Sequence, residues 1–381
     1  MRSALVRIGA IVRKEFRHLA RDPRMLLAVV ITPVIQLLLF AYAISFDVEN
    51  VPTIVIDLDQ TQTSRTYVER YEASTFFDVV AHGGTMAQVD AAFDANSARV
   101  AVVIPAGFAR TLASGEAAQV AVLIDGSEPT AAKVSQAYSV ALNQLYSQQL
   151  TRQWADQQGL DLSSLGTLEP RIRTWYNPER KSSDFLIPGL MVVILAIVTV
   201  QQTAVTLVRE RDQGTQEQLE VSPMRQIELM IGKLLPWTLI AFADMALITG
   251  LGRSIFGVPL RGDFWTLALG SALFVFASLG MGLVISAIAP SLDTANILAM
   301  LIAFLPAFLL SGFAFALDQI PVFLQWVSYL FPARFMVTIS RGVFLKGAGF
   351  MELWPELAAL TVYALVMLVI SSVLYGRRSA R

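Results

Sequence analysis

Six long apolar stretches interrupt this 381-residue chain, and only one of them contains a charged side chain. They cover residues 25–46, 185–208, 234–251, 264–289, 295–317 and 357–375. A helix of about 20 residues crosses the hydrocarbon core of a bilayer. Hydrophobic residues make up 55% of the chain and charged residues 15%, so a soluble fold could not shield this much apolar surface from water. The pattern predicts an α-helical integral membrane protein with six transmembrane helices.

Basic residues gather on one side of these predicted helices. Fourteen Lys and Arg residues lie before the first apolar stretch, within residues 209–233 or after the last stretch, whereas five lie in the short loops of the opposite side. Because the excess of Lys and Arg marks the cytoplasmic side, we expect both termini in the cytoplasm. The first stretch is too long for the core of a signal peptide, so we expect an uncleaved anchor.

The stretches and loops predict the order of domains. Residues 318–356 contain only short apolar runs, and a seventh span there would move the basic C-terminus outside, so we expect a re-entrant segment. The predicted organisation is a cytoplasmic amphipathic helix (1–24), a transmembrane helix (25–46), an extracytoplasmic α/β domain (47–184), a five-helix transmembrane region (185–375) that contains a cytoplasmic coupling hairpin (209–233) and the extracytoplasmic re-entrant segment (318–356), and a cytoplasmic tail (376–381).

The inserted domain is predicted from alternating patterns. Its β-branched runs fall at residues 53–56, 76–80, 100–104 and 120–124. Helix-compatible segments at 64–72, 86–95 and 105–114 separate them, and a long helix is expected over 130–158. Four acidic residues lie at predicted strand ends beside turn residues, where backbone capping explains them better than catalysis: Asp57, Asp59, Asp125 and Glu128.

Composition excludes several kinds of chemistry. The chain has no cysteine, which rules out disulfides and thiol nucleophiles, and only His18 and His82 could supply imidazole, so we expect no metal site. The net charge of −1 gives no reason to expect a nucleic-acid partner. The only Gly-Lys pair, Gly232-Lys233, lacks the rest of a phosphate-binding loop, so the chain itself carries no P-loop ATPase site. If ATP is used, a partner must hydrolyse it.

Two segments predicted on the cytoplasmic side carry patterned charge. Residues 4–21 alternate apolar and basic faces, as in a helix on a membrane surface, and Asp22-Pro23 marks the start of the next helix. The 209–233 hairpin has N-cap patterns at Thr215 and Ser222-Pro223, which predict short helices suited to receive force from a soluble motor. A topology anchor explains the first segment equally well, and a solvated linker is a simpler explanation of the second.

Polar side chains within the predicted spans are the remaining candidates. Asp244 lies near the middle of the third span, and Gln36, Gln201 and Gln202 are milder cases. Intramembrane acids commonly line a transport pathway. A helix–helix hydrogen bond explains Asp244 equally well. Ser278 and Gly280-x-Gly282 in the fourth span indicate close helix packing and not a cofactor loop.

An ordered set of short motifs resembles the permeases of ABC-2-type exporters, in the subgroup with a large domain after the first span. The matching residues are Lys14-Glu15, Arg21-Asp22-Pro23, Trp175-Tyr176-Asn177-Pro178-Glu179, Phe185, Pro188-Gly189, Val208-Arg209-Glu210-Arg211, Gly214-Thr215, Glu217, Leu219, Ser222-Pro223, Gly232-Lys233, Pro236, Ser311-Gly312, Pro332, Arg341-Gly342 and Lys346-Gly347. They run through nearly the whole chain in order. Asp212 stands where the family pattern has Glu, which leaves the charge of the loop unchanged.

The resemblance implies a role for the hairpin and a set of partners. The 214–223 element would be the coupling helix that docks on an ABC ATP-binding subunit, which would also hold ATP and magnesium; this chain would bind no cofactor. Residues expected at that interface are Arg209, Glu210, Arg211, Gly214, Thr215, Glu217, Leu219, Ser222, Pro223, Lys14, Glu15, Arg21 and Asp22. Two permease subunits, identical or different, would pair in the bacterial inner membrane, often with a periplasmic adaptor, to export drugs, lipids or other amphiphiles.

Two other functions fit parts of the sequence. A secondary transporter usually shows repeated halves and several intramembrane charges, whereas this chain has one intramembrane acid and no visible repeat. A membrane-anchored sensor or assembly factor would act through residues 47–184, but such a receptor needs only one or two spans. Dependence on a proton gradient would favour the first alternative, and isolation without any ATPase subunit would favour the second.

Overall fold

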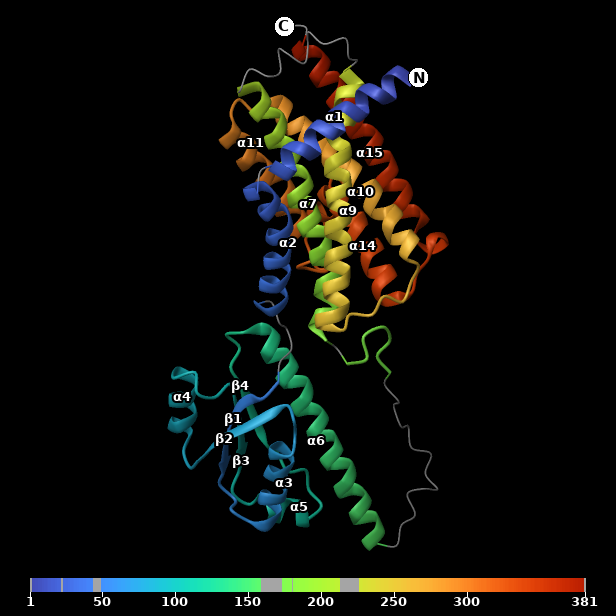
Figure 1. The fold of residues 1–381 in the computed structure, drawn as a ribbon. Coiled ribbons are helices and arrows are strands. Elements are labelled where there is room, and N and C mark those ends of the chain that lie inside the picture. Colours follow the sequence, from blue (N-terminus) through green and yellow to red (C-terminus); the bar gives the residue numbers. More distant parts are fainter. Residues whose placement is uncertain are drawn as a thin grey trace. The chain divides into compact units, whose positions relative to one another are not determined.

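The computed structural model describes residues 2–21, 23–43, 49–158, 173–179, 181–212 and 226–379 (Figure 1). The chain divides into two compact units, of which one comprises Met1–Ser45 and Thr174–Arg381 and the other Phe46–Arg173. The first unit is helical. Its elements are α1 (Arg2–Arg21), α2 (Pro23–Ala43), α7 (Ser182–Asp212), α9 (Gln226–Phe256), α10 (Phe264–Ile288), α11 (Leu292–Ala299), a π-helix (Met300–Phe304), α12 (Leu305–Leu309), α13 (Val322–Ser328), α14 (Pro332–Arg341), a second π-helix (Gly342–Lys346) and α15 (Phe350–Ser379).

Five helices in the described part are long and apolar enough to cross a membrane. They are Ser182–Val205, Ile231–Phe256, Phe264–Ile288, Leu292–Leu309 and Phe350–Leu374, and they fall on the last five predicted stretches. The first predicted stretch falls on the 21-residue helix α2. The prediction of a multi-pass helical membrane protein is therefore confirmed at this level.

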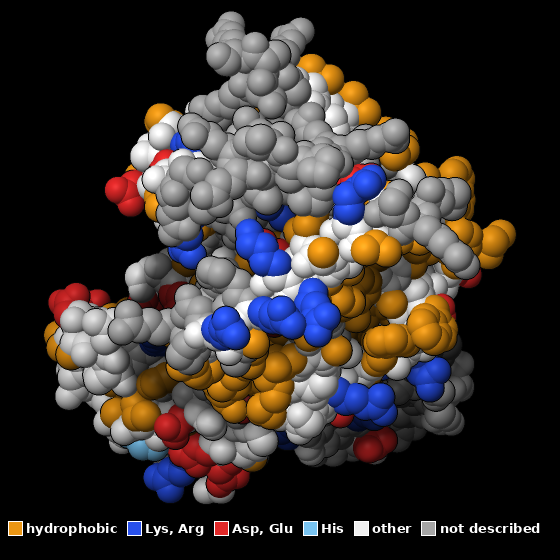
Figure 2. All heavy atoms as spheres, turned by 45° about the horizontal axis from the view of Figure 1, so that its top comes forward, with side chains coloured by type: hydrophobic (Ala, Val, Ile, Leu, Met, Phe, Trp, Pro, Cys, Tyr) orange, Lys and Arg blue, Asp and Glu red, His pale blue; other side chains and the backbone are white. Residues whose placement is uncertain are grey.

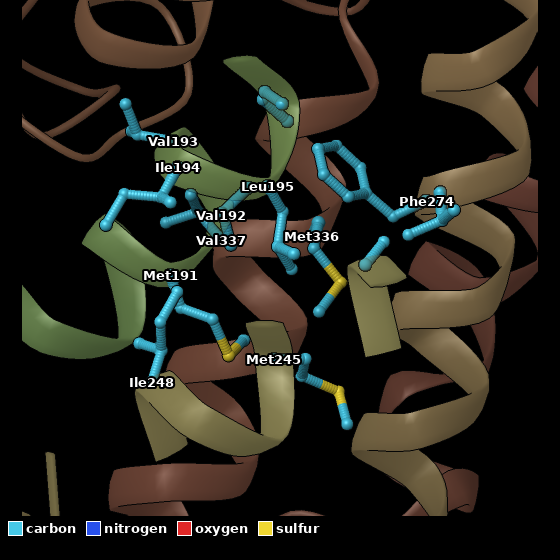
Figure 3. Close-up of a cluster of buried hydrophobic side chains, with 14 of the residues drawn as sticks. Met191, Val192, Val193, Ile194, Leu195, Met245, Ile248, Phe274, Met336 and Val337 are labelled. Atoms are coloured by element: carbon cyan, nitrogen blue, oxygen red, sulfur yellow. The ribbon is translucent and has the colours of Figure 1, made fainter. Parts of the chain in front are cut away.

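Helix α7 lies at the centre of the helical unit. In its most apolar segment 83% of the residues are buried inside the protein. The corresponding share is 22% for α15 and 28% for Leu292–Leu309. Figure 3 shows Met191 and Leu195 of α7 among Met245 of α9, Phe274 of α10 and Met336 of α14. The apolar side chains left exposed on α15 and on Leu292–Leu309 require either lipid or another protein chain around them.

Close packing at two glycines of α10 confirms the interpretation of that motif. A Cβ atom built on Gly280 would lie 2.7 Å from Cβ of Met367 in α15. A Cβ atom on Gly282 would lie 2.7 Å from the carbonyl oxygen of Val200 in α7. Glycine at these positions lets α10 approach both neighbours closely.

Two helix ends differ from those predicted from the apolar stretches. The fifth apolar stretch was expected to remain helical to residue 317, but the helix ends at Leu309, and Gly312 adopts a left-handed conformation with φ of +87°. The last helix begins at Phe350, seven residues earlier than its apolar stretch. Between these helices, Val322–Ser328 and Pro332–Lys346 form a pair bent by 89°, which is either a broken span or a re-entrant loop.

The second unit contains a four-stranded sheet with the order β2-β1-β3-β4. Strands β1 (Val51–Asp57), β2 (Phe77–Gly83) and β3 (Val100–Ile104) are parallel, and β4 (Ala121–Ile124) pairs antiparallel with β3. The described part of this unit also contains helices α3 (Gln62–Glu72), α4 (Met86–Asp94), α5 (Phe108–Ala113) and α6 (Pro129–Gln157). All four strands and all four helices fall on the segments predicted for them.

Three of the four acidic residues of this unit, Asp57, Asp59 and Asp125, have the turn and cap roles predicted for them, whereas the side chain of Glu128 does not cap its helix. Asp57 accepts hydrogen bonds from the amides of Asp59 and Gln60. Asp59 in turn accepts from the amides of Gly107 at 2.8 Å and Ala109 at 3.1 Å, where α5 begins. Together with the hydroxyl of Thr61, these donors hold the pKa of Asp59 below its usual value. Asp125 accepts from the amide of Ser127, and Glu128 pairs with Arg99.

Candidate functional site

The predicted coupling residues lie partly outside the described structure. Asp22, Gly214, Thr215, Glu217, Leu219, Ser222 and Pro223 fall outside the described residues, and of Glu210 only the helical backbone is described. The structure does describe Arg209 and Arg211 at the end of α7, and Lys14, Glu15 and Arg21 on α1. It also shows how the two ends of the hairpin are held.

The end of α7 is tied to the end of α10 by Arg211. The Nη2 atom of Arg211 donates to the carbonyl oxygens of Ala289 and Pro290, both at 3.0 Å. Nε of Arg211 also lies 3.7 Å from a carboxylate oxygen of Asp212. These carbonyls follow the last residue of α10, so the side chain connects the end of α7 to the loop that follows α10.

The start of α9 is tied to α1 by an ion pair that sequence reasoning missed. Nε and Nη2 of Arg7 each donate to one carboxylate oxygen of Glu228 at 2.7 Å, a bidentate contact between residues 221 positions apart. The carboxylate raises the pKa of Arg7, chiefly through the hydrogen bond. Glu228 is 5% exposed, so α1 supplies the charge that this acid needs.

Apolar packing reinforces the ion pair one helical turn further along. Ile11 of α1 is buried, and a Cβ atom built on Gly232 of α9 would lie 2.7 Å from its Cβ. Glycine at residue 232 therefore allows α1 to lie directly on α9. Arg7, Ile11, Glu228 and Gly232 form what we call the α1–α9 contact.

Apart from Arg7, the described basic residues of α1 lie on its outer side. In Figure 1, α1 crosses the end of the helical unit, and Figure 2 shows Lys and Arg side chains in a row across that end. Arg13, Lys14, Arg17 and Arg21 line one wall of an open groove with Val6, Gly9 and Ala10. Lys14 also lies 3.8 Å from the carboxylate of Glu15. Leu5 and Phe16 are exposed on a further side of the helix.

The intramembrane polar residues separate into two groups. Gln201 donates to Oδ1 of Asn296 at 3.2 Å and so joins α7 to α11 by a helix–helix hydrogen bond. Asp244 is 3% exposed, and its Oδ2 atom has no hydrogen-bond partner among the described residues. Gln36 likewise has a buried oxygen without a described partner. Gln202 is partly buried in α7.

A second cluster of the quoted motifs meets at the other end of α7. Nη1 of Arg341 donates to the carbonyl oxygen of Gly312 at 2.7 Å, and its guanidinium lies 3.7 Å from the ring centre of Phe185. Ser340 donates to the carbonyl oxygen of Pro188 at 2.9 Å. The sequence contained these motifs as separate pairs, but nothing in their spacing showed that they are in contact.

The fold and these contacts define a polytopic membrane protein whose membrane helices are joined by tight polar contacts at both ends of α7. The model of the ABC-2 family of transporter proteins matches residues 23–373. This chain belongs to that family.

Curated relatives match over nearly the whole chain. The probable multidrug ABC transporter permease YbhS of Escherichia coli K12 is 31% identical over 342 residues, which cover 90% of this chain and 89% of the relative. The probable multidrug ABC transporter permease YbhR of the same organism is 26% identical, covering 93% and 94%. ABC transporter G family member 20 of Dictyostelium discoideum is 24% identical over 95% of this chain and half of its own length.

Proposed function

We propose that this chain is the permease subunit of an ATP-driven ABC exporter, and that a separate nucleotide-binding subunit hydrolyses ATP with magnesium. The observation that carries the proposal is the family match over residues 23–373 in a sequence that contains no P-loop. The chain would form the transmembrane pathway and would not be an enzyme by itself. Two of its relatives bear the name multidrug permease, which supports a hydrophobic or amphiphilic substrate such as a drug or a lipid.

The proposed orientation follows the distribution of basic residues. Both termini would lie in the cytoplasm, and the unit Phe46–Arg173, with its sheet and helices, would be an inserted α/β domain outside the inner membrane. The bent pair Val322–Ser328 and Pro332–Lys346 would then be the re-entrant segment on the extracytoplasmic side. A periplasmic adaptor is a partner that such a domain could contact.

The proposed docking surface for the ATP-binding subunit is the 209–233 hairpin with the basic side of α1. Arg211 fixes one end of the hairpin, and the α1–α9 contact fixes the other. A push on the hairpin would therefore reach α7, α9 and α1 together. The exposed apolar residues Leu5 and Phe16 would rest on membrane lipid, while Arg13 and Arg17 would face the soluble subunit.

A second permease subunit, identical or different, would cover part of the exposed apolar surface. The candidates for that contact are the poorly buried helices α15 and Leu292–Leu309. Their exposed side chains are large and aliphatic, as at Leu301, Leu305, Val366 and Val369. Such a surface suits either a helix of a partner subunit or lipid.

Variants of the hairpin test this proposal. Gly214→Pro, or Thr215→Ala combined with Glu217→Lys, should leave membrane insertion normal but reduce co-purification of the ATP-binding subunit several-fold or uncouple its turnover from substrate. Loss of an N-cap costs about 0.5–2 kcal/mol, which is enough to fray a helix of one or two turns. Co-purification and substrate-stimulated ATP turnover in vesicles are the measurements.

The chain offers a matched control in its other unit. Thr85 lies at the N-cap of α4, and Asp90 is an exposed acid of the same helix. Thr85→Ala combined with Asp90→Lys repeats the cap loss and the charge reversal away from the proposed interface, and it should keep both measurements normal. Wild-type behaviour of the hairpin variants would mean that the hairpin is only a linker.

A further inference from the structure

Arg341 connects three segments that are distant in the sequence. At the end of α14, its Nη1 atom donates to the carbonyl oxygen of Gly312 at 2.7 Å and its Nη2 atom to that of Phe313 at 3.2 Å. Both carbonyls belong to the loop that follows α12, which ends at Leu309. The guanidinium also lies over the ring of Phe185, near the start of α7.

The same three segments pack tightly around this side chain. A Cβ atom built on Gly189 of α7 would overlap the ring of Phe313, which is 1% exposed. The hydroxyl of Ser340 donates to the carbonyl oxygen of Pro188 at 2.9 Å. The loop after α12 is thus held against α7 by one ring, and against α14 by one arginine.

The cluster lies far from the coupling hairpin. Phe185 and Arg211 are both on α7, and the 26 residue steps from one to the other span about 39 Å at 1.5 Å per residue. If the hairpin is cytoplasmic, as proposed above, the Arg341 cluster lies at the extracytoplasmic end of the helical unit. Any substrate that leaves along α7 would have to pass this end.

The contacts of Arg341 are suited to being made and broken. Its described hydrogen bonds go to neutral carbonyl oxygens, and its Nε atom has no partner among the described residues. In the sequence, one π-helix, Met300–Phe304, precedes the loop that contains Gly312, and a second, Gly342–Lys346, directly follows Arg341. Wide helical turns of this kind frequently lie at functional sites. The loop that follows α12 also turns at Gly312, which adopts a left-handed conformation.

We propose that Arg341 is a positioning residue that latches the loop 310–313 onto α7 and α14 and keeps the extracytoplasmic end of the pathway closed at rest. Release of the Gly312 and Phe313 carbonyls opens this end during transport. The inference rests on the proposed function, which places the Arg341 cluster at the extracytoplasmic end. The contact of Arg341 with the loop in the resting protein can be tested without measuring transport.

The cysteine-free sequence allows a direct test. Ser311, 1% exposed and bonded to the carbonyl oxygen of Ala307, is replaced by cysteine as the only thiol in the chain. Labelling by a membrane-impermeant maleimide is followed in spheroplasts that produce the full chain together with its ATP-binding subunit. We expect slow labelling at rest. In Arg341→Gln labelling should be at least about tenfold faster, the effect expected from losing even one of its two charge-assisted hydrogen bonds.

Two further variants make the test specific. Arg341→Lys keeps the charge but cannot reach both carbonyls, and labelling at an intermediate rate is expected. Arg334→Gln is the matched control, because Arg334 also lies on α14, donates to the carbonyl oxygen of Gln325 and covers the ring of Tyr329, without touching residues 310–313. It should label like the parent. If Arg341→Gln does not accumulate in the membrane, the comparison between Arg341→Lys and the parent decides.

Unchanged labelling in the Arg341 variants, or an equal increase in Arg334→Gln, would overturn the latch. ATP turnover separates this failure from failure of the proposed function. If the complex co-purifies and shows substrate-stimulated turnover, but the labelling rate does not depend on Arg341, only the proposed role of Arg341 is disproved. A chain that binds no ATP-binding subunit, but whose labelling depends on Arg341, disproves the exporter and keeps the resting contact.

Discussion

Asp244 is the residue that most directly tests the pathway. It is 3% exposed, and its Oδ2 atom has no partner among the described residues, although an acid at a span centre costs about 2.5–3.5 kcal/mol on insertion scales. If substrate contacts this carboxylate, Asp244→Asn should lower export about tenfold and leave the amount of assembled protein nearly unchanged. Export from vesicles, normalised to permease in the membrane, is the measurement.

Two further variants show whether a loss of export in Asp244→Asn comes from the carboxylate itself. Thr249→Val lies on the same helix and removes only a weak contact with Sδ of Met191, so it should keep normal export. Asp244→Leu removes the cost of placing an acid in the membrane. Intact export in Asp244→Leu would show that the carboxylate has no transport role and that the position serves packing.

At the scale of elements, the α1–α9 contact predicts that a larger side chain at residue 232 separates α1 from α9. Gly232→Leu should push α1 off α9, because a Cβ atom there meets Ile11, and overpacking of this kind costs about 1–3 kcal/mol. Trypsin cleavage at Arg13 and Arg17 in the purified protein should become faster. Ile11→Ala in the same chain should restore much of the protection.

Gly250 supplies the control for this change. It lies in the same helix, and a Cβ atom built on it meets no atom within 4 Å. Gly250→Leu should therefore leave α1 as protected as in the parent chain. Equal sensitivity of the Gly232 and Gly250 variants to trypsin would show that the effect comes from helix α9 itself and not from its contact with α1.

For the whole molecule, the charge bias predicts one topology. Tags at either terminus should be reached only from the cytoplasm, and a tag inserted within residues 60–150 should be reached from outside. Accessibility of each tag to an impermeant protease, before and after the membrane is opened, is the measurement. An N-terminus cleaved from outside would reverse the assignment.

The spans could be predicted because length and hydropathy are local properties of the sequence. The early end of the fifth helix could not, since it depends on Gly312 and on the reach of Arg341 from 29 residues away. The pairing of Arg7 with Glu228 was equally hidden, because positive charge before a span has a sufficient explanation in topology alone. The strands of the second unit were found because β-branched runs alternate there with helical patterns. Contacts between distant segments were the part that no local pattern contained.

The ion pair between Arg7 and Glu228 also sets a waiting time during biosynthesis. A ribosome that adds about 5–20 residues per second needs about 10–45 s to make the 221 residues that separate these partners. Throughout that interval α1 has emerged with its arginine unmatched, while Glu228 does not yet exist. Until α9 is made, the Arg7 side chain is solvated by water or by lipid headgroups, so its pairing with Glu228 is a late step in the assembly of the helical unit.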